Sequence, residues 1–150
     1  MFLGKYPNSI DSKGRAIIPA KFRHGLGERC VLTRGADKCL HIFTPDALEK
    51  YMEEHIVNRP EEDEKARMLK LAFFANVTEC DIDKQGRIKI PAEFLEFADI
   101  EKEMINVGMK DYIQVWGKEI LDKKMSAPGM DQGALMANMT KYVEKGGQAR

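Results

Sequence analysis

Two arginines at equivalent places in a repeated five-residue motif are the side chains of this sequence best suited to bind a ligand. Residues 11–15 read D-S-K-G-R and residues 83–87 read D-K-Q-G-R, so both share the pattern Asp-x-x-Gly-Arg. Aspartate at the first position and glycine at the fourth are typical of a type I turn, because the carboxylate accepts backbone N–H groups and glycine tolerates a positive φ. Arg15 and Arg87 each follow such a turn, where a guanidinium can bind a phosphate or a guanine base.

Lysines close to the two motifs add charge that can reach phosphates. We therefore expect nucleic acid to be bound by the cations within and beside the two motifs, which are Arg15, Arg87, Lys13, Lys84 and Lys89. We expect the turns themselves to be formed by Asp11, Gly14, Asp83 and Gly86. The alternative is that the two arginines pair with the two aspartates inside the turns. The sequence leaves both roles open, because one does not exclude the other.

The motifs belong to a longer internal repeat. Residues 10–22 and 82–94 are identical at eight of thirteen positions. The offset is 72 residues there and 73 further on, where Cys39–Phe43 aligns with Tyr112–Trp116. Self-similarity of this kind indicates a tandem duplication.

Each copy predicts the same elements. Strand-like residues flank the turn, as in 87–90, where cations alternate with isoleucines. A proline then begins a short helix over 19–25 or 91–98, and a second hairpin spans 31–43 or 104–116. Longer helices are expected after Thr44, from Pro60 onward and over 118–125. In the alternation around His41, that side chain is expected to face solvent.

These elements predict an α+β fold in which two β-β-α-β-β repeats are interleaved. One copy of about 40 residues cannot build a sufficient core. Two copies are therefore expected to interdigitate into one closed barrel, which would also remove sheet edges. The expected organisation is repeat 1 at 4–50, a helical connector at 51–75, repeat 2 at 76–122 and a flexible tail at 126–150.

The charge distribution favours a polyanionic partner although the net charge is zero. Residues 1–40 carry eight basic and three acidic side chains, a net charge of +5. Residues 41–75 carry a net charge of −3 and residues 76–150 a net charge of −2. A basic end beside an acidic connector is the asymmetry expected of a nucleic-acid binder.

Other classes of protein are disfavoured. His24, His41 and His55 have no Ser, Cys or carboxylate arrangement around them, so no enzyme and no cofactor is expected. The acids at 61–64 are better explained as a solvated helix start than as a metal site. Cys30, Cys39 and Cys80 have neither disulfide nor zinc spacing and are expected to be reduced and partly buried. With no membrane span or signal peptide, the protein is expected in the cytoplasm.

The sequence resembles the MraZ family, which belongs to the AbrB-like swapped-hairpin group of DNA binders. The residues that carry the resemblance are Met1-Phe-x-Gly4, the two Asp-x-x-Gly-Arg motifs and the segment from Val107-Gly108 to Trp116. The resemblance covers about residues 1–125 and leaves the tail out.

The resemblance implies a nucleoid-associated transcriptional regulator, commonly a repressor, of the bacterial division and cell-wall gene cluster. It implies a ring-shaped homo-oligomer that binds repeated promoter sequences in double-stranded DNA. The family's Asp-x-x-x-Arg motif falls on Asp11 and Arg15 and on Asp83 and Arg87. Gln85 stands where the first motif has Lys13, so the two hairpins are expected to contribute unequally. The alternative is a ring-forming interaction module that binds protein and not DNA.

Overall fold

The computed structural model describes residues 1–139. They form two compact units, Met1–Lys118 and the residues from Glu119 onward, and each unit is described by itself. The first repeat contains β1 (Phe2–Ser9), β2 (Arg15–Ile17), α1 (Ala20–Leu26), β3 (Arg29–Arg34) and β4 (Leu40–Phe43). The second contains β5 (Val77–Asp81), β6 (Arg87–Lys89), α4 (Ala92–Phe97), β7 (Glu103–Lys110) and β8 (Ile113–Gly117). The predicted β-β-α-β-β order is therefore confirmed in both repeats.

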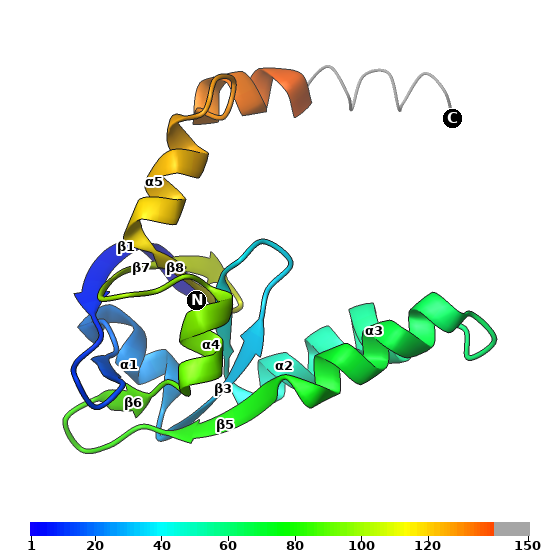
Figure 1. The fold of residues 1–150 in the computed structure, drawn as a ribbon, viewed down its shortest axis with the longest axis horizontal. Coiled ribbons are helices and arrows are strands. Elements are labelled where there is room, and N and C mark those ends of the chain that lie inside the picture. Colours follow the sequence, from blue (N-terminus) through cyan, green and yellow to red (C-terminus); the bar gives the residue numbers. More distant parts are fainter. Residues whose placement is uncertain (140–150) are drawn as a thin grey trace. The chain divides into compact units, whose positions relative to one another are not determined.

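A helical arm joins the repeats (Figure 1). It consists of α2 (Pro45–Met52), a π-helical turn η1 (Glu53–Val57) and α3 (Glu64–Ala75). Thr44 caps α2 as predicted, because its Oγ1 accepts the backbone N–H of Ala47 at 3.1 Å. Asp63 caps α3 through the N–H of Lys65 at 2.9 Å. The π-helical turn was not predicted.

The chain continues from the second repeat into α5 (Lys118–Ser126). Residues 132–139 are also helical. The flexible tail expected at 126–150 falls partly on residues 140–150, which lie outside the described residues.

The two repeats exchange strands. The large antiparallel sheet has the order β1-β7-β8-β4-β3-β5. The first strand of each repeat therefore pairs with the third strand of the other: β1 with β7, and β5 with β3. At the centre, β4 of one repeat pairs with β8 of the other. This reciprocal exchange confirms that the repeats are interleaved.

The second strands of the repeats pair with each other in a separate two-stranded ribbon. In it, Ala16 lies opposite Ile88 and Arg15 lies opposite Lys89. Beyond the ribbon's ends the exchange is again reciprocal: the N–H of Ile18 donates to Gly86 O and the N–H of Ile90 donates to Gly14 O, both at 2.8 Å. Each turn is thus hydrogen-bonded to the strand that follows the other turn.

The expected closed barrel is wrong in one respect. Among the described residues, β1 and β5 form opposite edges of the six-stranded sheet and do not pair with each other. The β2–β6 ribbon forms a sheet of its own, linked to the end of β1 by the single bridge Ile10–Ala16. Each of β1 and β5 therefore has one edge without a partner strand in the six-stranded sheet, and the ladder does not close on itself.

The main hydrophobic core lies on one face of the six-stranded sheet, and both repeats contribute residues to it. It is built from paired equivalents such as Ile18 with Ile90 and Phe22 with Phe94. All four of these side chains are at most 2% exposed. The three cysteines are at most 7% exposed and are therefore more deeply buried than the sequence predicted.

The opposite face of the sheet is covered by the helical arm. Val31, Phe43 and Leu48 form a second cluster there, against which Tyr51 and Phe73 pack. His41 lies on this face and is only 8% exposed, so the expectation that it faces solvent is wrong. The alternation of residues 40–42 does place His41 away from the main core, but the arm excludes water from that face as well.

Burial lowers the pKa of His41 to about 4, opposed by the nearby charge of Asp37. The imidazole is therefore neutral at physiological pH. Its ring lies 4.7 Å from that of Tyr112, centroid to centroid.

Two glycines allow β1 and β7 to approach closely. Gly4 and Gly108 lie directly opposite each other in the pairing of these strands. A Cβ on Gly108 would collide with the backbone of Phe2 and Leu3, and Gly4 has a φ of 95°. Both positions therefore require glycine.

Candidate nucleic-acid interface

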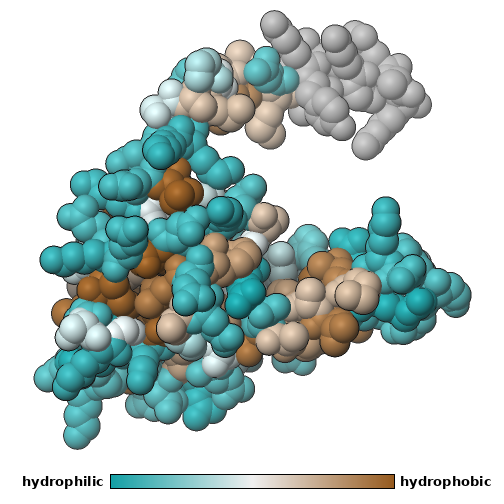
Figure 2. Space-filling model, viewed as in Figure 1, coloured by the Kyte–Doolittle hydropathy of each residue, from teal (hydrophilic) through white to brown (hydrophobic). Residues whose placement is uncertain are grey.

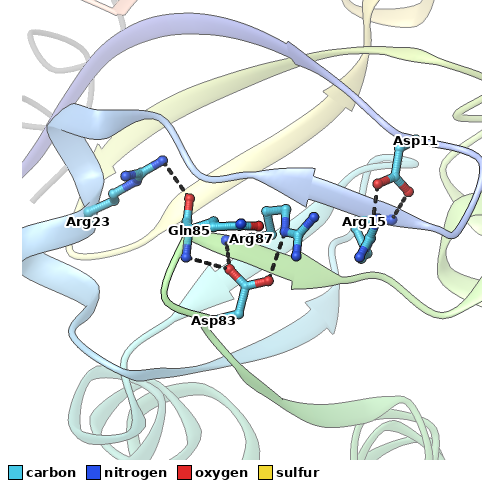
Figure 3. A network of polar contacts seen from close by, with 6 residues as sticks. All are labelled: Asp11, Arg15, Arg23, Asp83, Gln85 and Arg87. Atoms are coloured by element: carbon cyan, nitrogen blue, oxygen red, sulfur yellow. Dashed lines mark hydrogen bonds and ion pairs between the residues drawn. The ribbon is translucent and has the colours of Figure 1, made fainter.

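The two Asp-x-x-Gly-Arg motifs fold into turns of nearly identical geometry (Figure 3). In the first turn, Asp11 Oδ1 accepts the backbone N–H groups of Lys13 at 2.9 Å and Arg15 at 2.8 Å. The N–H of Gly14 donates to Asp11 O at 3.1 Å, and Gly14 has a φ of 78°. The carboxylate and the glycine thus shape the turn in the way that the sequence indicates.

The second turn repeats this arrangement. Asp83 Oδ1 accepts the backbone N–H groups of Gln85 and Arg87, both at 2.9 Å. Gly86 has a φ of 79°, and its N–H donates to Asp83 O at 2.9 Å. The two turns therefore have equivalent hydrogen bonds at every position of the motif.

Each motif arginine also pairs with the aspartate of its own turn. Arg15 Nε lies 3.0 Å from Asp11 Oδ2, and Arg87 Nε lies 2.8 Å from Asp83 Oδ2. The intramolecular pairing that the sequence left open is therefore present. It uses Nε alone, and no hydrogen bond within the described part of the chain occupies the Nη nitrogens of either arginine. These nitrogens are available to a ligand, so pairing and ligand binding are compatible.

The pKa values of both aspartates lie below the usual range. The largest cause for Asp11 is the hydrogen bond from the backbone N–H of Arg15, and for Asp83 that from the N–H of Arg87. Partial desolvation opposes the shift, while the second backbone N–H and the guanidinium assist it. Both carboxylates are therefore ionised at neutral pH, and both are held by donors from their own turns.

The β2–β6 ribbon presents the cations on one face. Its central residues Ala16 and Ile88 point into the core and are 4% and 2% exposed. Strand alternation sends the residues on either side of them to the outer face. That face carries three cations and one apolar side chain, namely Arg15, Arg87, Lys89 and Ile17.

The remaining predicted cations lie in the turns that flank this face. Lys13 is in the first turn and Lys84 in the second, and both are exposed. The structure therefore brings all five predicted cations to the ribbon and its two turns. That they contact nucleic acid stays a prediction.

Arg23 is a residue of this region that the sequence analysis missed. It lies on α1, and its Nη2 donates to Gln85 O in the second turn at 3.0 Å (Figure 3). Its Nε donates to Ile18 O at 3.3 Å. No local pattern could reveal this contact, because Arg23 and Gln85 are 62 residues apart in the sequence. The only available signal was that Arg23 has no cationic counterpart in the second repeat, where Leu95 stands.

The side chains gathered at this surface are mainly cationic. Within residues 1–139 no group of three or more His, Cys, Asp or Glu side chains could hold a metal ion. None of the helices in that range is long and apolar enough to cross a membrane. Fixed guanidinium and ammonium groups around a short ribbon can bind the phosphates and base edges of a polyanion.

Comparison with known proteins gives a consistent result. The family model described as "MraZ protein, putative antitoxin-like" matches residues 1–71 and 73–127. The chain is 45% identical over 123 residues to the transcriptional regulator MraZ of Caldanaerobacter subterraneus subsp. tengcongensis, covering 82% of this chain and 85% of that relative. The proteins of the same name from a Thermoanaerobacter species and from Desulforamulus reducens are 44% and 41% identical over the same length, which covers 85% and 86% of those relatives.

Proposed function

The chain belongs to the MraZ family, and from that premise we propose that it is a transcriptional regulator that binds double-stranded DNA through its two repeated turns. The observation that carries the proposal is the outer face of the β2–β6 ribbon. Five cations lie on this ribbon and its turns, while the carboxylates of Asp11 and Asp83 are held by backbone N–H groups and by the motif arginines. The surface left for a ligand is therefore cationic.

The geometry suits duplex DNA. The major groove admits a two-stranded β-ribbon, and an arginine can bind guanine O6 and N7 or a phosphate with two nitrogens. Arg15 and Arg87 retain both Nη nitrogens for this purpose, and the Asp contact to Nε fixes the direction of each guanidinium. The lysines add phosphate contacts, which supply salt-dependent affinity.

We further propose that copies of the chain assemble into a ring. The arm carries large apolar side chains that the described residues leave uncovered, and Figure 2 shows apolar residues gathered along it. Leu71 on α3 is 62% exposed, and Met68 and Phe74 are 54% and 52% exposed. Exposed apolar patches mark interaction sites, and a head-to-tail contact that closes produces a ring.

The biological role proposed for this assembly rests on the family resemblance. In this role, the ring binds successive repeats of a promoter and represses the division and cell-wall gene cluster. The binding takes place in the cytoplasm, at the nucleoid. Transcriptional regulators are not an enzyme class, so binding is the whole of the proposed activity.

The test is a mobility-shift titration with duplex DNA taken from upstream of the chain's own gene. The double variant Arg15→Ala, Arg87→Ala removes both guanidinium groups but leaves the backbone hydrogen bonds to Asp11 and Asp83 in place. Affinity should fall at least about tenfold, because a bidentate arginine contributes about 1–3 kcal/mol. The slope of log K against log salt should decrease by about 2.

A matched control removes two positive charges elsewhere. Lys38 and Lys118 form ion pairs with Asp99 and Glu103, and neither lysine belongs to the ribbon or to its two turns. The variant Lys38→Ala, Lys118→Ala should bind nearly as the parent chain does. Equal losses in the two double variants would mean that only net charge matters, and the proposed site would be wrong. Absence of binding by the parent chain, with a ring still formed, would favour the interaction module without DNA.

A further inference from the structure

The two turns are alike within themselves but are supported differently from outside. Arg23 reaches from α1 of the first repeat to the second turn and donates to Gln85 O. Through Nε it also holds Ile18 O, and the N–H of Ile18 donates to Gly86 O. The guanidinium thus ties the second turn to the strand that crosses beside it.

The space beside the two turn glycines differs accordingly. A Cβ on Gly86 would collide with the guanidinium of Arg23, so that side chain fills the space against the second turn. A Cβ on Gly14 would meet only Ile90 O, at 3.4 Å. The first turn therefore lacks the covering side chain that the second has.

The position equivalent to Arg23 is occupied by an apolar residue. Leu95 stands there on α4, and it packs against the core. A leucine has no donor to offer a carbonyl of the first turn. The contact of Arg23 with the second turn, which we call the brace, therefore has no equivalent at the first turn. The two repeats that surround these turns have the same order of elements.

The charges presented by the two halves of the ribbon are also unequal. Ser12 and Lys13 of the first turn correspond to Lys84 and Gln85 of the second. On the strands, Ile17 corresponds to Lys89, and Ile17 is 51% exposed. The two halves therefore offer different side chains to equivalent places on a ligand.

We propose that Arg23 is a positioning residue that pre-orders the second turn, and that the braced and unbraced turns make each chain bind DNA in one fixed direction. This inference rests on the proposed function. A pre-ordered turn loses less conformational entropy on binding than a turn that must be ordered by the ligand. With different side chains on the two halves, reversing the DNA exchanges unequal contacts, so one direction is favoured.

The first experiment measures the brace without DNA, by amide hydrogen exchange of the full chain. The N–H groups of Gly14 and Gly86 make the same bond within their turns. Exchange at Gly86 should be about three- to tenfold slower, the effect of one additional hydrogen bond that is exposed to solvent. The variant Arg23→Leu should remove this difference. Lys21→Leu, which loses an equal charge from an exposed position on the same helix, should preserve it.

The second experiment measures direction on DNA. Native cysteines are at most 7% exposed, so the variants Ser12→Cys and Lys84→Cys can each be labelled selectively with a DNA-cleaving iron chelate. The probe is a duplex that carries one promoter repeat from upstream of the chain's own gene. The two labels should cleave at opposite ends of the repeat. Arg23→Leu should weaken binding about three- to tenfold and make cleavage more even between the ends.

The outcomes separate the two proposals. Equal exchange at Gly14 and Gly86, or unchanged exchange in Arg23→Leu, would overturn the brace. Equal cleavage at both ends from each label would overturn the fixed direction. If exchange differs as expected but the parent chain binds no duplex, the proposed function fails and the directional binding fails with it, while the brace stands.

Discussion

Replacing the buried His41 by phenylalanine should remove a specific part of the acid sensitivity of the fold. The pKa of His41 is about 4 in the folded chain, lowered chiefly by burial from an ordinary value of 6.5. As the pH falls below 6.5, the unfolded chain binds a proton that the folded chain does not. The free energy of unfolding therefore decreases with falling pH, and this contribution levels off below about pH 4.

The size of the effect follows from the two pKa values. One pKa unit corresponds to about 1.4 kcal/mol, so His41 should lower the free energy of unfolding by about 2 to 2.5 kcal/mol between pH 7 and pH 4.5. Asp11 and Asp83 act in a separate range. Their folded pKa values are lowered from 3.8, so their stabilisation is present above that pH and is lost only as the pH falls further.

Urea denaturation followed by the fluorescence of Trp116 measures this contribution, at one protein concentration and at several pH values. His41→Phe keeps a ring beside Phe43 and Tyr112 and contains no titrating group. Between pH 7 and pH 4.5, the free energy of unfolding should decrease by about 2 to 2.5 kcal/mol less in the variant than in the parent chain. His24 and His55 are present in both proteins and cancel in the comparison. Parallel pH profiles would refute the argument, since His41 would then be hydrated in the folded chain.

Three further changes test other parts of the structure. Asp83→Ala removes the acceptor of two backbone N–H groups, so it should loosen the second turn, as the loss of a capping side chain loosens a helix end, and speed exchange at Gly86. Lost DNA binding with unchanged exchange would instead assign Asp83 to direct contact. Gly108→Ala places a methyl against the β1 backbone, so the free energy of unfolding should decrease by about 1–3 kcal/mol and the unfolding midpoint should fall. An unchanged midpoint would show that β1 can move away freely. Leu71→Lys should reduce the mass measured by light scattering and abolish the preference for operators with three repeats over one; an intact ring would remove α3 from the interface.

The elements that the sequence predicted well are those that depend on near neighbours. Each Asp-x-x-Gly-Arg turn is closed by bonds within five residues, and Thr44 caps α2 through a residue three positions away. The internal repeat then indicated that both turns recur on one scaffold. Interleaving could also be predicted, because a single repeat has too little core of its own.

The features that the sequence did not reveal depend on contacts between distant segments. His41 is buried beneath the helical arm, and the alternation of residues in its strand does not indicate where that arm lies. Arg23 contacts a turn of the other repeat. The open edges at β1 and β5 follow from the strand order of the whole sheet, which no local pattern reports. The sequence could not show whether Arg15 pairs with Asp11 or binds a ligand, since a guanidinium side chain suits both roles.

The exchange of strands between the repeats has a consequence for how the chain folds during synthesis. β1 is made first, but its partner β7 is about 100 residues later. At about 5–20 residues per second, the ribosome delivers that partner roughly 5–20 seconds after β1. During this interval β3 and β4 can pair with each other, but β1 has no native partner on its own chain. A neighbouring chain that already contains its second repeat offers the same β7 sequence to β1. The order of synthesis therefore makes cross-pairing between chains the characteristic misfolding route, and chaperone protection of the first repeat should matter more than that of the second.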